Sequence, residues 1–247
     1  MTVEPTPNES PAEAIGNCPL CGGRADRRYH PGTARHYQWC NTCDLVSVPP
    51  EDRVSRDSEV KRYLEHDNGF HQRGYVQMLS RFLDRAVDPW TAVDPWTTVD
   101  PRPTKGAFRE SRGIRLLDYG CGYAPVLSAL ARGRGYEARG WDRNFLPDAE
   151  ALKHSYDVVT ACEVIEHLAE PASFFTHVRG LLAPGGLLAV RSSLHPPTWD
   201  AFRRFWYIRD RTHISYFSHT TVEYCAETFG FDIELCEDPV WVLRRQT

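Results

Sequence analysis

The segment Leu116-Leu117-Asp118-Tyr119-Gly120-Cys121-Gly122-Tyr123-Ala124-Pro125 decides how the rest of this chain is interpreted. An apolar run leads into the two glycines, and residues 126–131 follow with helical spacing. This pattern predicts a buried parallel strand, a tight glycine turn and a helix that packs back on the strand. Open α/β sheets bind their ligands at the carboxyl ends of the strands, so we expect Asp118 to lie beside a ligand site.

The chain after this turn alternates between strand and helix patterns. Apolar strand patterns cover residues 136–142, 155–162 and 187–192, and a helical pattern covers residues 172–182. The first of these strands ends in Asp142, 20 residues past Gly122, where an acid can accept hydrogen bonds from both ribose hydroxyls of a nucleoside. The alternation predicts a doubly wound, mostly parallel α/β sheet.

Two CxxC pairs near the N-terminus predict a separate small module. They are separated by 18 residues and consist of Cys18, Cys21, Cys40 and Cys43. This spacing is typical of a zinc ribbon, in which four thiolates hold one structural Zn²⁺. A module this small buries too little surface to fold alone, so the metal would supply much of its folding free energy. The ribbon either contacts a substrate or partner or braces the larger domain, and we favour bracing.

The predicted organisation has five parts. They are a disordered tail (1–15), the zinc ribbon (16–50), a helical bridge or lid (51–87), a proline-rich repeat linker (88–112) and the large α/β domain (113–247). The linker repeats Val-Asp-Pro-Trp-Thr at a spacing of six residues, and proline at that period opposes both a helix and a central strand. We interpret the aromatic, arginine-rich residues 199–208 as part lid and part buried amphipathic helix.

Composition limits the class of protein and its partners. The 247 residues carry a formal net charge of −4, so no overall basic field attracts nucleic acid. No apolar run is long enough to cross a membrane, and the polar N-terminus lacks the apolar core of a signal peptide. Eight cysteines without a secretion signal fit a reducing compartment, so we expect a cytoplasmic protein with no membrane partner. The oligomeric state stays open.

These motifs resemble those of the class I S-adenosylmethionine-dependent methyltransferases. Residues 118–122 resemble the first motif of that family, Asp142 resembles its ribose-binding acid, and residues 182–186 resemble its Pro-Gly-Gly turn before a late strand. The resemblance implies a seven-stranded sheet and S-adenosylmethionine as the cofactor. The segment between Asp142 and Asp157 is shorter than usual, which leaves Phe145 and Asp148 as candidates for the adenine contact. The cofactor-binding residues that the resemblance implies are Asp118, Gly120, Cys121, Gly122, Asp142, Phe145 and Glu163.

With the ribbon included, the chain is similar to bacterial zinc-ribbon methyltransferases whose substrates are largely unassigned. In those proteins an Arg-Tyr-x-x-His-x-Asn segment precedes the fold, as residues 62–68 do here. A nicotinamide-dependent Rossmann enzyme is the rival interpretation of a glycine turn followed by a strand-end acid. Gly120 and Gly122, however, are followed by Tyr-Ala-Pro-Val, without the third glycine of the dinucleotide-binding pattern.

The candidate catalytic residues are two acids and two histidines: Glu163, Glu166, His167 and His213. Side chains of these types can bind Mg²⁺, Mn²⁺ or Zn²⁺, or can act as acid and base. Together they resemble the metal site of small-RNA 3′-end 2′-O-methyltransferases, and the Glu-x-x-Glu-His part resembles the quinone-biosynthesis O-methyltransferases. A divalent metal there would bind a diol and lower the pKa of the hydroxyl to be methylated. The alternative is a site without metal, in which the acids cap a helix and the histidines position the substrate.

Methyl transfer to a small molecule is the favoured function, on an oxygen of a sugar, phenol or other metabolite. One alternative is an RNA ribose methyltransferase that uses the ribbon to contact RNA. The other is a non-catalytic binding module that keeps the fold. The intact Gly120, Gly122 and Asp142 favour cofactor binding over loss of it.

Overall fold

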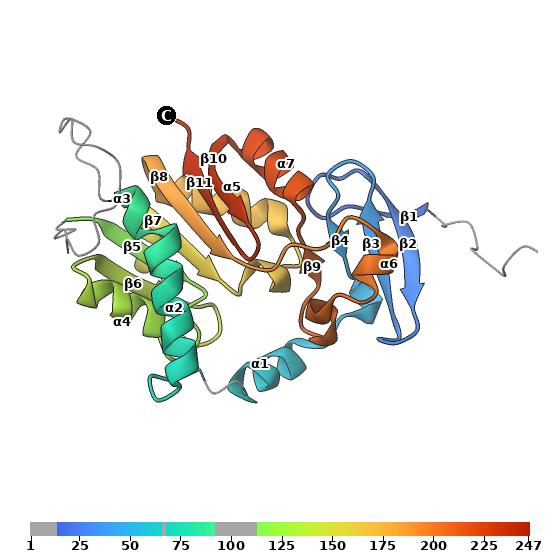
Figure 1. Cartoon of the computed structure of the whole chain (residues 1–247), viewed down its shortest axis with the longest axis horizontal. Coiled ribbons are helices and arrows are strands. Elements are labelled where there is room, and N and C mark those ends of the chain that lie inside the picture. The colour runs from blue at the N-terminus through green and yellow to red at the C-terminus, as the bar shows by residue number, and fades with distance from the viewer. Residues whose placement is uncertain (1–13, 66–67, 92–112) are drawn as a thin grey trace, which may run out of the picture.

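A six-stranded mixed sheet forms the centre of the structure, a computed structural model that describes residues 14–65, 68–91 and 113–247 (Figure 1). The strand order is β10-β11-β8-β7-β5-β6. The parallel strands are β5 (Arg115–Tyr119), β6 (Glu137–Trp141), β7 (Tyr156–Cys162) and β8 (Leu182–Arg191). β10 (Phe231–Glu237) and β11 (Val240–Arg245) form an antiparallel hairpin beside β8.

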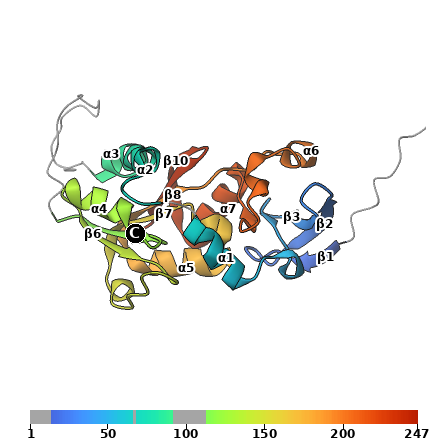
Figure 2. The ribbon, with the colours of Figure 1, turned by 90° about the horizontal axis from the view of Figure 1, so that it is seen from below.

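Helices cover both faces of this sheet, as Figure 2 shows from below. Successive residues of a strand point to opposite faces. Leu116 and Val158 therefore pack against one pair of helices, and Leu117 and Val159 pack against the other pair. The first pair is α2 (Arg73–Ala86) and α4 (Val126–Gly133), and the second is α5 (Pro171–Leu181) and α7 (His219–Phe229).

The predicted sheet had seven strands, mostly parallel, and this count is wrong for the described residues. After β6 the chain turns back at once, because Asp142 and Leu146 exchange backbone hydrogen bonds of 3.0 Å. Only a short 3-10 helix, η2 (Ala151–Lys153), follows before β7. A further helix and strand need more residues than this segment has, so β6 forms the edge of the sheet.

The N-terminal module is a second sheet, with five antiparallel strands. Four come from the predicted ribbon: β1 (Ala14–Asn17), β2 (Arg24–His30), β3 (Arg35–Cys40) and β4 (Val46–Ser47). The fifth, β9 (Ser215–Tyr216), belongs to the large domain and pairs with β4. The ribbon and the large domain therefore share a sheet. Most of the predicted tail lies outside the described residues, and β1 includes its last two positions.

Residues 199–208 pack against the ribbon. They form α6 (Trp199–Phe202) and most of the 3-10 helix η4 (Trp206–Arg209). Phe202 is fully buried, and its ring meets that of Tyr37 edge-on with the centroids 5.2 Å apart. The buried part of this prediction is confirmed, since Phe202 and Tyr207 fill the junction between the ribbon and the large domain, whereas Trp206 is 60% exposed.

The bridge contains two helices, α1 (Arg56–Glu65) and α2, and is followed by a third. The linker was predicted to begin at residue 88, but Asp88–Thr91 form a short helix, α3. Pro89 is its second residue, where a missing N–H removes no helical hydrogen bond. The Asp88 carboxylate accepts a hydrogen bond of 2.7 Å from the Tyr136 hydroxyl, which ties α3 to the large domain. The rest of the repeat, residues 92–112, lies outside the described residues.

Among the described residues, every helix is too short or too polar to span a lipid bilayer.

Candidate functional site

The glycine turn lies between the end of β5 and the start of α4. Gly120 and Gly122 have φ angles of 80° and 68°, in the left-handed region that glycine adopts without strain. A Cβ atom at position 120 would come within 2.5 Å of the Val164 side chain, so this position has no room for one. The amides of Gly120 and Cys121 donate to the carbonyl oxygen of Trp141, at 2.7 and 3.1 Å. The turn is thereby fixed to the end of β6.

Asp118 lies beneath the turn, with 3% of its surface exposed. Its carboxylate accepts hydrogen bonds from the Ser128 amide at 3.3 Å and from the Thr160 hydroxyl at 3.4 Å. Burial raises the pKa of Asp118 to about 7. Asp118 therefore braces the end of β5 against the first turn of α4. Cys121 is a buried neighbour, and burial raises the pKa of its thiol to about 12, which is typical of a core residue and not of a nucleophile.

Asp142 organises the loop after β6. Its Oδ1 accepts hydrogen bonds from the amides of Asn144 and Phe145, at 2.8 and 3.0 Å. Its Oδ2 accepts one from the Gly122 amide at 3.1 Å. A carboxylate has about four acceptor positions, so one position on Oδ2 remains. In this arrangement Asp142 can accept one ribose hydroxyl, whereas the sequence predicted that it would accept two.

Aromatic rings from α1 and from the glycine turn meet at Phe145. Tyr63 and Tyr123 lie edge-on to Phe145, with centroid distances of 6.4 and 6.1 Å. Tyr63 also lies 5.1 Å from the ring of His167. Burial raises the pKa of the Tyr63 hydroxyl, which donates to Glu59 at 3.1 Å. Tyr63 therefore connects the predicted cofactor side of the site with the predicted catalytic side.

α1 crosses between two loops at the carboxyl ends of the strands. At its start, Arg56 donates to the Asn144 side chain at 3.0 Å, and near its end Arg62 lies 3.4 Å from the Asp210 carboxylate. In Figure 1, α1 lies between α2 and the ribbon. α1 is therefore held against both loops by side-chain contacts.

Glu166, His167 and His213 lie together. One ligand atom from each can be chosen so that all lie within 4.8 Å of one another. The Nδ1 atom of His167 faces the Thr212 carbonyl oxygen at 3.0 Å, and that of His213 faces the Tyr207 carbonyl oxygen at 2.9 Å. Carbonyl oxygens only accept hydrogen bonds, so in the neutral rings Nδ1 carries the proton and Nε2 carries the lone pair. A metal-binding histidine is held in this way by a backbone carbonyl.

Glu166 completes this group and is fully buried. Its Oε1 accepts a hydrogen bond from the Tyr207 hydroxyl, and its Oε2 has no hydrogen-bond partner among the described residues. Burial raises the pKa of Glu166 to about 7. Two imidazole nitrogens and one carboxylate oxygen are a donor set that suits a divalent transition metal or Zn²⁺.

Glu163 is not part of the group of three, although the sequence predicted a set of four. It pairs with Arg191 at the end of the neighbouring strand β8 and accepts a hydrogen bond of 3.0 Å from the Tyr207 hydroxyl. Its φ angle is 55°, which is unusual for a residue with a side chain. The strand order pairs Cys162 with Arg191, so the neighbouring Arg191 could have been foreseen from a correct sheet order. Tyr207 lies in the aromatic segment 199–208 that the sequence singled out, but nothing in the sequence assigned it to these two acids.

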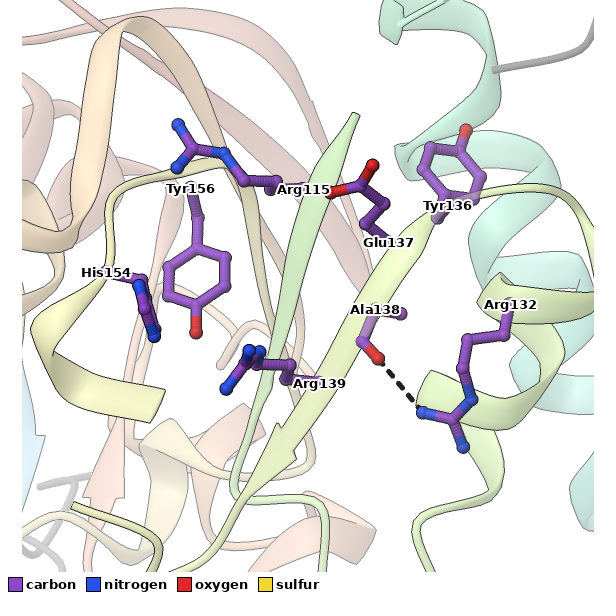
Figure 3. A pocket seen from close by; sticks show the side chains of 8 residues that line it. All are labelled: Arg115, Arg132, Tyr136, Glu137, Ala138, Arg139, His154 and Tyr156. Atoms are coloured by element: carbon purple, nitrogen blue, oxygen red, sulfur yellow. Dashed lines mark hydrogen bonds between the residues drawn. The ribbon is translucent and has the colours of Figure 1, made fainter. Parts of the chain in front are cut away.

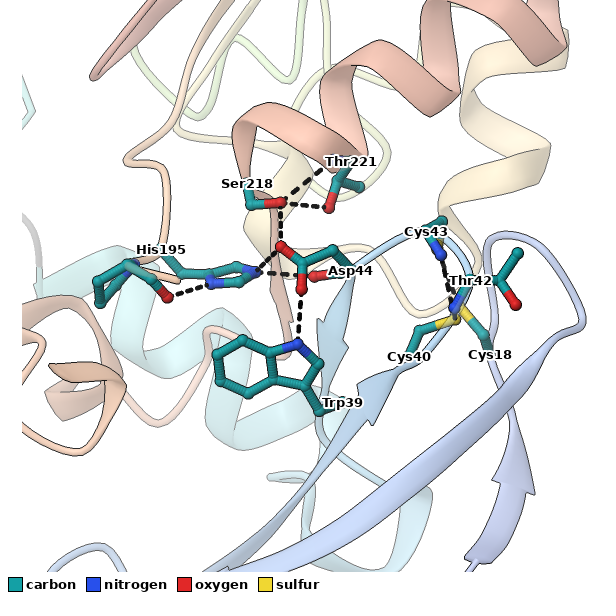
Figure 4. Close-up of polar contacts among 10 residues, drawn as sticks. Cys18, Trp39, Cys40, Thr42, Cys43, Asp44, His195, Ser218 and Thr221 are labelled. Atoms are coloured by element: carbon teal, nitrogen blue, oxygen red, sulfur yellow. Dashed lines mark hydrogen bonds and ion pairs between the residues drawn. The ribbon is translucent and has the colours of Figure 1, made fainter. Parts of the chain in front are cut away.

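The four ribbon cysteines converge, as predicted. The Sγ atoms of Cys18 and Cys43 are 3.5 Å apart, and those of Cys21 and Cys40 are 3.4 Å apart (Figure 4 shows the knuckle of Cys40 and Cys43). Four thiolates around Zn²⁺ would be spaced by about 3.8 Å, given a metal–sulfur distance of about 2.3 Å. The amide of Gly23 points at Cys21 Sγ at 3.3 Å, as expected beside thiolates. The cluster therefore fits a structural zinc ion.

Asp44 connects this knuckle to the large domain (Figure 4). Its carboxylate accepts hydrogen bonds of 2.6 Å from the Trp39 indole and from the Ser218 hydroxyl. Its carbonyl oxygen lies 2.8 Å from Nε2 of the buried His195. His195 therefore serves the junction between the ribbon and the large domain.

A depression of about 290 Å³ lies elsewhere, at the amino ends of β5 and β6 (Figure 3). Arg132 borders it and donates to the Ala138 carbonyl oxygen at 3.0 Å. The glycine turn lies at the opposite, carboxyl ends of the same strands, so this depression is separate from the group of Glu166, His167 and His213. Its lining residues are Arg115, Arg132, Tyr136, Glu137, Ala138, Arg139, His154 and Tyr156.

Comparison with known proteins matches residues 98–235 to the family model described as "Methyltransferase domain". The ubiquinone biosynthesis O-methyltransferase of Cereibacter sphaeroides is 35% identical over 99 residues, which cover 31% of this chain and 40% of that protein. The protein of the same name from Vibrio cholerae is 32% identical over 98 residues, covering 30% of this chain and 40% of that one. The chain thus spans about two fifths of the length of the curated relatives that it matches.

Among solved structures, an O-methyltransferase family protein from Burkholderia thailandensis has a TM-score of 0.47 at 14% identity, covering 75% of this chain and 62% of that one. An S-adenosylmethionine-dependent methyltransferase from Mesorhizobium loti has a TM-score of 0.43 at 17% identity, covering 56% and 93%.

Proposed function

Because the chain belongs to the methyltransferase domain family, we propose that it transfers the methyl group of S-adenosylmethionine to an oxygen of a small-molecule acceptor. The curated relatives support this proposal, since those from Cereibacter sphaeroides and Vibrio cholerae are named O-methyltransferases. Asp142 and the turn of Gly120, Cys121 and Gly122 would bind the cofactor, with Asp118 bracing the turn from below. Phe145 would supply an apolar surface for the adenine ring.

We base the proposal that a metal assists the reaction on the group of Glu166, His167 and His213. Both histidines are oriented by backbone carbonyls through Nδ1, and Glu166 has a buried oxygen that no described residue hydrogen-bonds. A buried acceptor without a donor is unfavourable unless something positive neutralises it. A divalent metal held there would orient an acceptor diol and lower the pKa of the reacting hydroxyl. Two imidazoles favour Zn²⁺ over Mg²⁺, which prefers oxygen ligands.

The surrounding residues would prepare the site for transfer. Methyl transfer is a displacement in line with the sulfonium, so the acceptor oxygen must be aligned and its proton removed. His167 and His213 would accept that proton if no metal were bound. Tyr63 and the rest of α1 would cover the strand ends and exclude water. Glu163, held by Arg191, would hydrogen-bond the cofactor from the end of β7.

The ribbon would hold a structural Zn²⁺ through Cys18, Cys21, Cys40 and Cys43. Four cysteines fill a tetrahedral ion and leave no open position, so this metal would take no part in the reaction. Its contribution would be to fold the ribbon and, through β4 and β9, to support the large domain.

The test is to measure metal content and acceptor specificity together. The purified protein should hold two metals per chain, and Glu166→Gln should lose one of them while keeping the ribbon zinc. Glu227→Gln, on the exposed face of α7, is the matched control and should keep both. Labelled S-adenosylmethionine should transfer its methyl group to catechols or phenols, and the transfer should fall at least 100-fold in Glu166→Gln.

Two results would contradict the proposal. Transfer to an RNA oligonucleotide but to no small molecule would favour the RNA alternative. A single metal in the wild type, with transfer insensitive to added Mn²⁺ or Zn²⁺, would remove the metal-assisted step while leaving His167 and His213 as base candidates.

A further inference from the structure

Arg35 is the most unusual charged residue of the structure. It lies on β3 of the ribbon with 0% of its surface exposed. Its Nη1 donates to the His213 carbonyl oxygen at 3.4 Å, but Nε and Nη2 have no hydrogen-bond partner in the described part of the chain. No acidic residue there pairs with it, and the charge of Arg35 instead helps to lower the pKa of the half-buried Arg53, after the larger effect of burial.

A buried guanidinium without a counter-charge does not stabilise a fold. Arginine stays protonated in proteins, so the charge cannot be removed. The effective cost of burying one unpaired ion is several kcal/mol, and an apolar residue of similar volume is often as stable or more stable there. Residues that break such a rule without local compensation are expected at functional sites. The partner that Arg35 does have is therefore informative.

That partner is the backbone of His213, which is held from several sides. Its carbonyl oxygen also accepts a hydrogen bond of 3.0 Å from the Tyr216 hydroxyl. Its ring is held through Nδ1 by the Tyr207 carbonyl oxygen. The next residue, Ile214, donates its amide to the Glu166 carbonyl oxygen at 2.7 Å. The peptide of His213 thus lies between the ribbon and the turn that carries Glu166.

The ribbon also holds the residue after His213. The Val48 amide donates to the Ile214 carbonyl oxygen at 2.8 Å. Val48 directly follows β4 and Ile214 directly precedes β9, so this hydrogen bond continues the pairing of the two strands. A shift of the His213 peptide by a few tenths of an ångström would move its ring relative to His167, which now lies 4.9 Å away between ring centroids. Sites that bind metals or transfer groups need such positions held within about 0.5 Å.

We propose that Arg35 is a positioning residue of the methyltransferase site, through which the zinc ribbon sets the place of His213 beside His167 and Glu166. The proposal rests on the proposed function of that group. Arg35 touches neither cofactor nor acceptor in this role. Arg35 hydrogen-bonds the His213 carbonyl oxygen and so holds the His213 peptide in place. The position of this peptide in turn determines where the His213 ring lies.

The test compares Arg35→Met with Arg27→Met, which removes a ribbon arginine that pairs with Glu51 at the surface. Arg35→Met should keep one ribbon zinc, bind S-adenosylmethionine within twofold of the wild type, and melt at the same or a higher temperature. Its affinity for Co²⁺ at the group of Glu166, His167 and His213 should fall about tenfold, as expected for one lost charge-assisted hydrogen bond. The visible absorption bands of the bound Co²⁺ should change as well. Arg27→Met should match the wild type in each measurement.

A second measurement separates this proposal from the metal proposal. Long-range ¹H–¹⁵N spectra of the protein without a second metal should show His213 protonated at Nδ1 in the wild type and in a mixture of tautomers in Arg35→Met. Wild type that binds no Co²⁺ outside the ribbon would overturn the metal proposal, and the histidine spectra would still decide the role of Arg35. Unchanged spectra in Arg35→Met would overturn the role proposed for Arg35.

Arg35→Lys guards against a folding defect. It keeps the charge and one donor, so it should restore part of the His213 signal. Loss of ribbon zinc and of melting temperature in both variants, with cofactor affinity falling in parallel, would show that Arg35 serves the fold as a whole and would overturn the proposal.

Discussion

Replacing Asp142 should disconnect the cofactor loop from the sheet. The Asp142 carboxylate accepts three backbone hydrogen bonds, from Gly122, Asn144 and Phe145. Each hydrogen bond to a charged acceptor is worth about 1.5 kcal/mol, so the three sum to about 4.5 kcal/mol. In the variant, water hydrogen-bonds the amides that Asp142 no longer holds. This reduces the expected loss of binding free energy to about 3 kcal/mol. That loss corresponds to about a 100-fold weaker affinity for S-adenosylmethionine, if binding must restore the loop.

Two variants separate the loop from the ribose contact. Asp142→Ala removes all three hydrogen bonds and should weaken binding about 100-fold, with a lower melting temperature. Asp142→Asn keeps an oxygen for the amides of Asn144 and Phe145 but turns an NH2 group toward the Gly122 amide. It should therefore weaken binding about tenfold and melt close to the wild type. Calorimetric titration with S-adenosylmethionine and a thermal melt without it provide the two measurements.

Either of two results would contradict the role given to the Asp142 carboxylate in organising the cofactor loop. Asp142→Ala that binds within threefold of the wild type would show that the carboxylate does not organise the cofactor site. Asp142→Asn that binds as weakly as Asp142→Ala, with the melting temperature of the wild type, would assign the affinity to a direct ribose contact and not to the loop.

Three further predictions follow from buried groups. Asp118→Asn should weaken the dependence of stability on pH. Burial raises the pKa of Asp118 from 3.8 to about 7, so the stability that this group contributes is full below pH 4 and is lost as pH rises through 7. Between pH 5 and 8, urea unfolding should show a loss that is about 2.7 kcal/mol larger in the wild type than in the variant, which keeps the similar contribution of Glu166. Cys40→Ser should lower the zinc content by one ion per chain and expose the ribbon to protease, while Cys236→Ser, outside the cluster, should do neither. Phe202→Ala should cost about 3 to 5 kcal/mol in urea unfolding, because a fully buried ring is lost at the junction with the ribbon; a cost below about 1 kcal/mol would mean that this junction carries little stability.

Short sequence patterns correctly predicted the strands, helices and turns whose formation depends mainly on neighbouring residues. The apolar run before Gly120 became β5, and the helical spacing after it became α4, since each pattern is read within a few residues. The four cysteines converge for the same reason, because each CxxC pair is a short turn and its spacing is characteristic. Asp142 follows β6 as predicted, because a strand pattern also shows where the strand ends.

Pairings between distant segments were not predictable in the same way. Nothing in the sequence indicates that Tyr216 pairs with Val46, because two-residue strands carry no pattern of their own. The seventh strand came from the family resemblance and not from residues of this chain, and the short segment after Asp142 cannot supply it. Residues 199–208 have the composition of either a lid or a buried junction, and only the position of the ribbon decides between them.

The candidate site was predicted in its residues but not in their connections. Glu166, His167 and His213 were identified from their types and spacing, and they do lie together. Glu163 was assigned to the same set, yet it pairs with Arg191. Whether Glu163 or Glu166 joins the histidines depends on the neighbouring strand and on the backbone angles. The spacing of residues along the sequence specifies neither.

Three departures from ordinary folding rules meet around one loop. Glu163 has a left-handed backbone angle. Within the described part of the chain, Glu166 has a buried oxygen without a donor and Arg35 has buried donors without an acceptor. Each costs on the order of 1 to 3 kcal/mol. Other buried atoms of the described residues also lack a partner, namely Nε1 of Trp90 and Trp241 and Nε of Arg245, so the position of these three departures matters more than their number. Glu163 and Glu166 are joined by the hydroxyl of Tyr207, whose carbonyl oxygen holds the ring of His213, and Arg35 holds the carbonyl oxygen of that same residue. Their convergence on His213 is best explained if the arrangement serves the reaction, since the fold alone would be more stable without it.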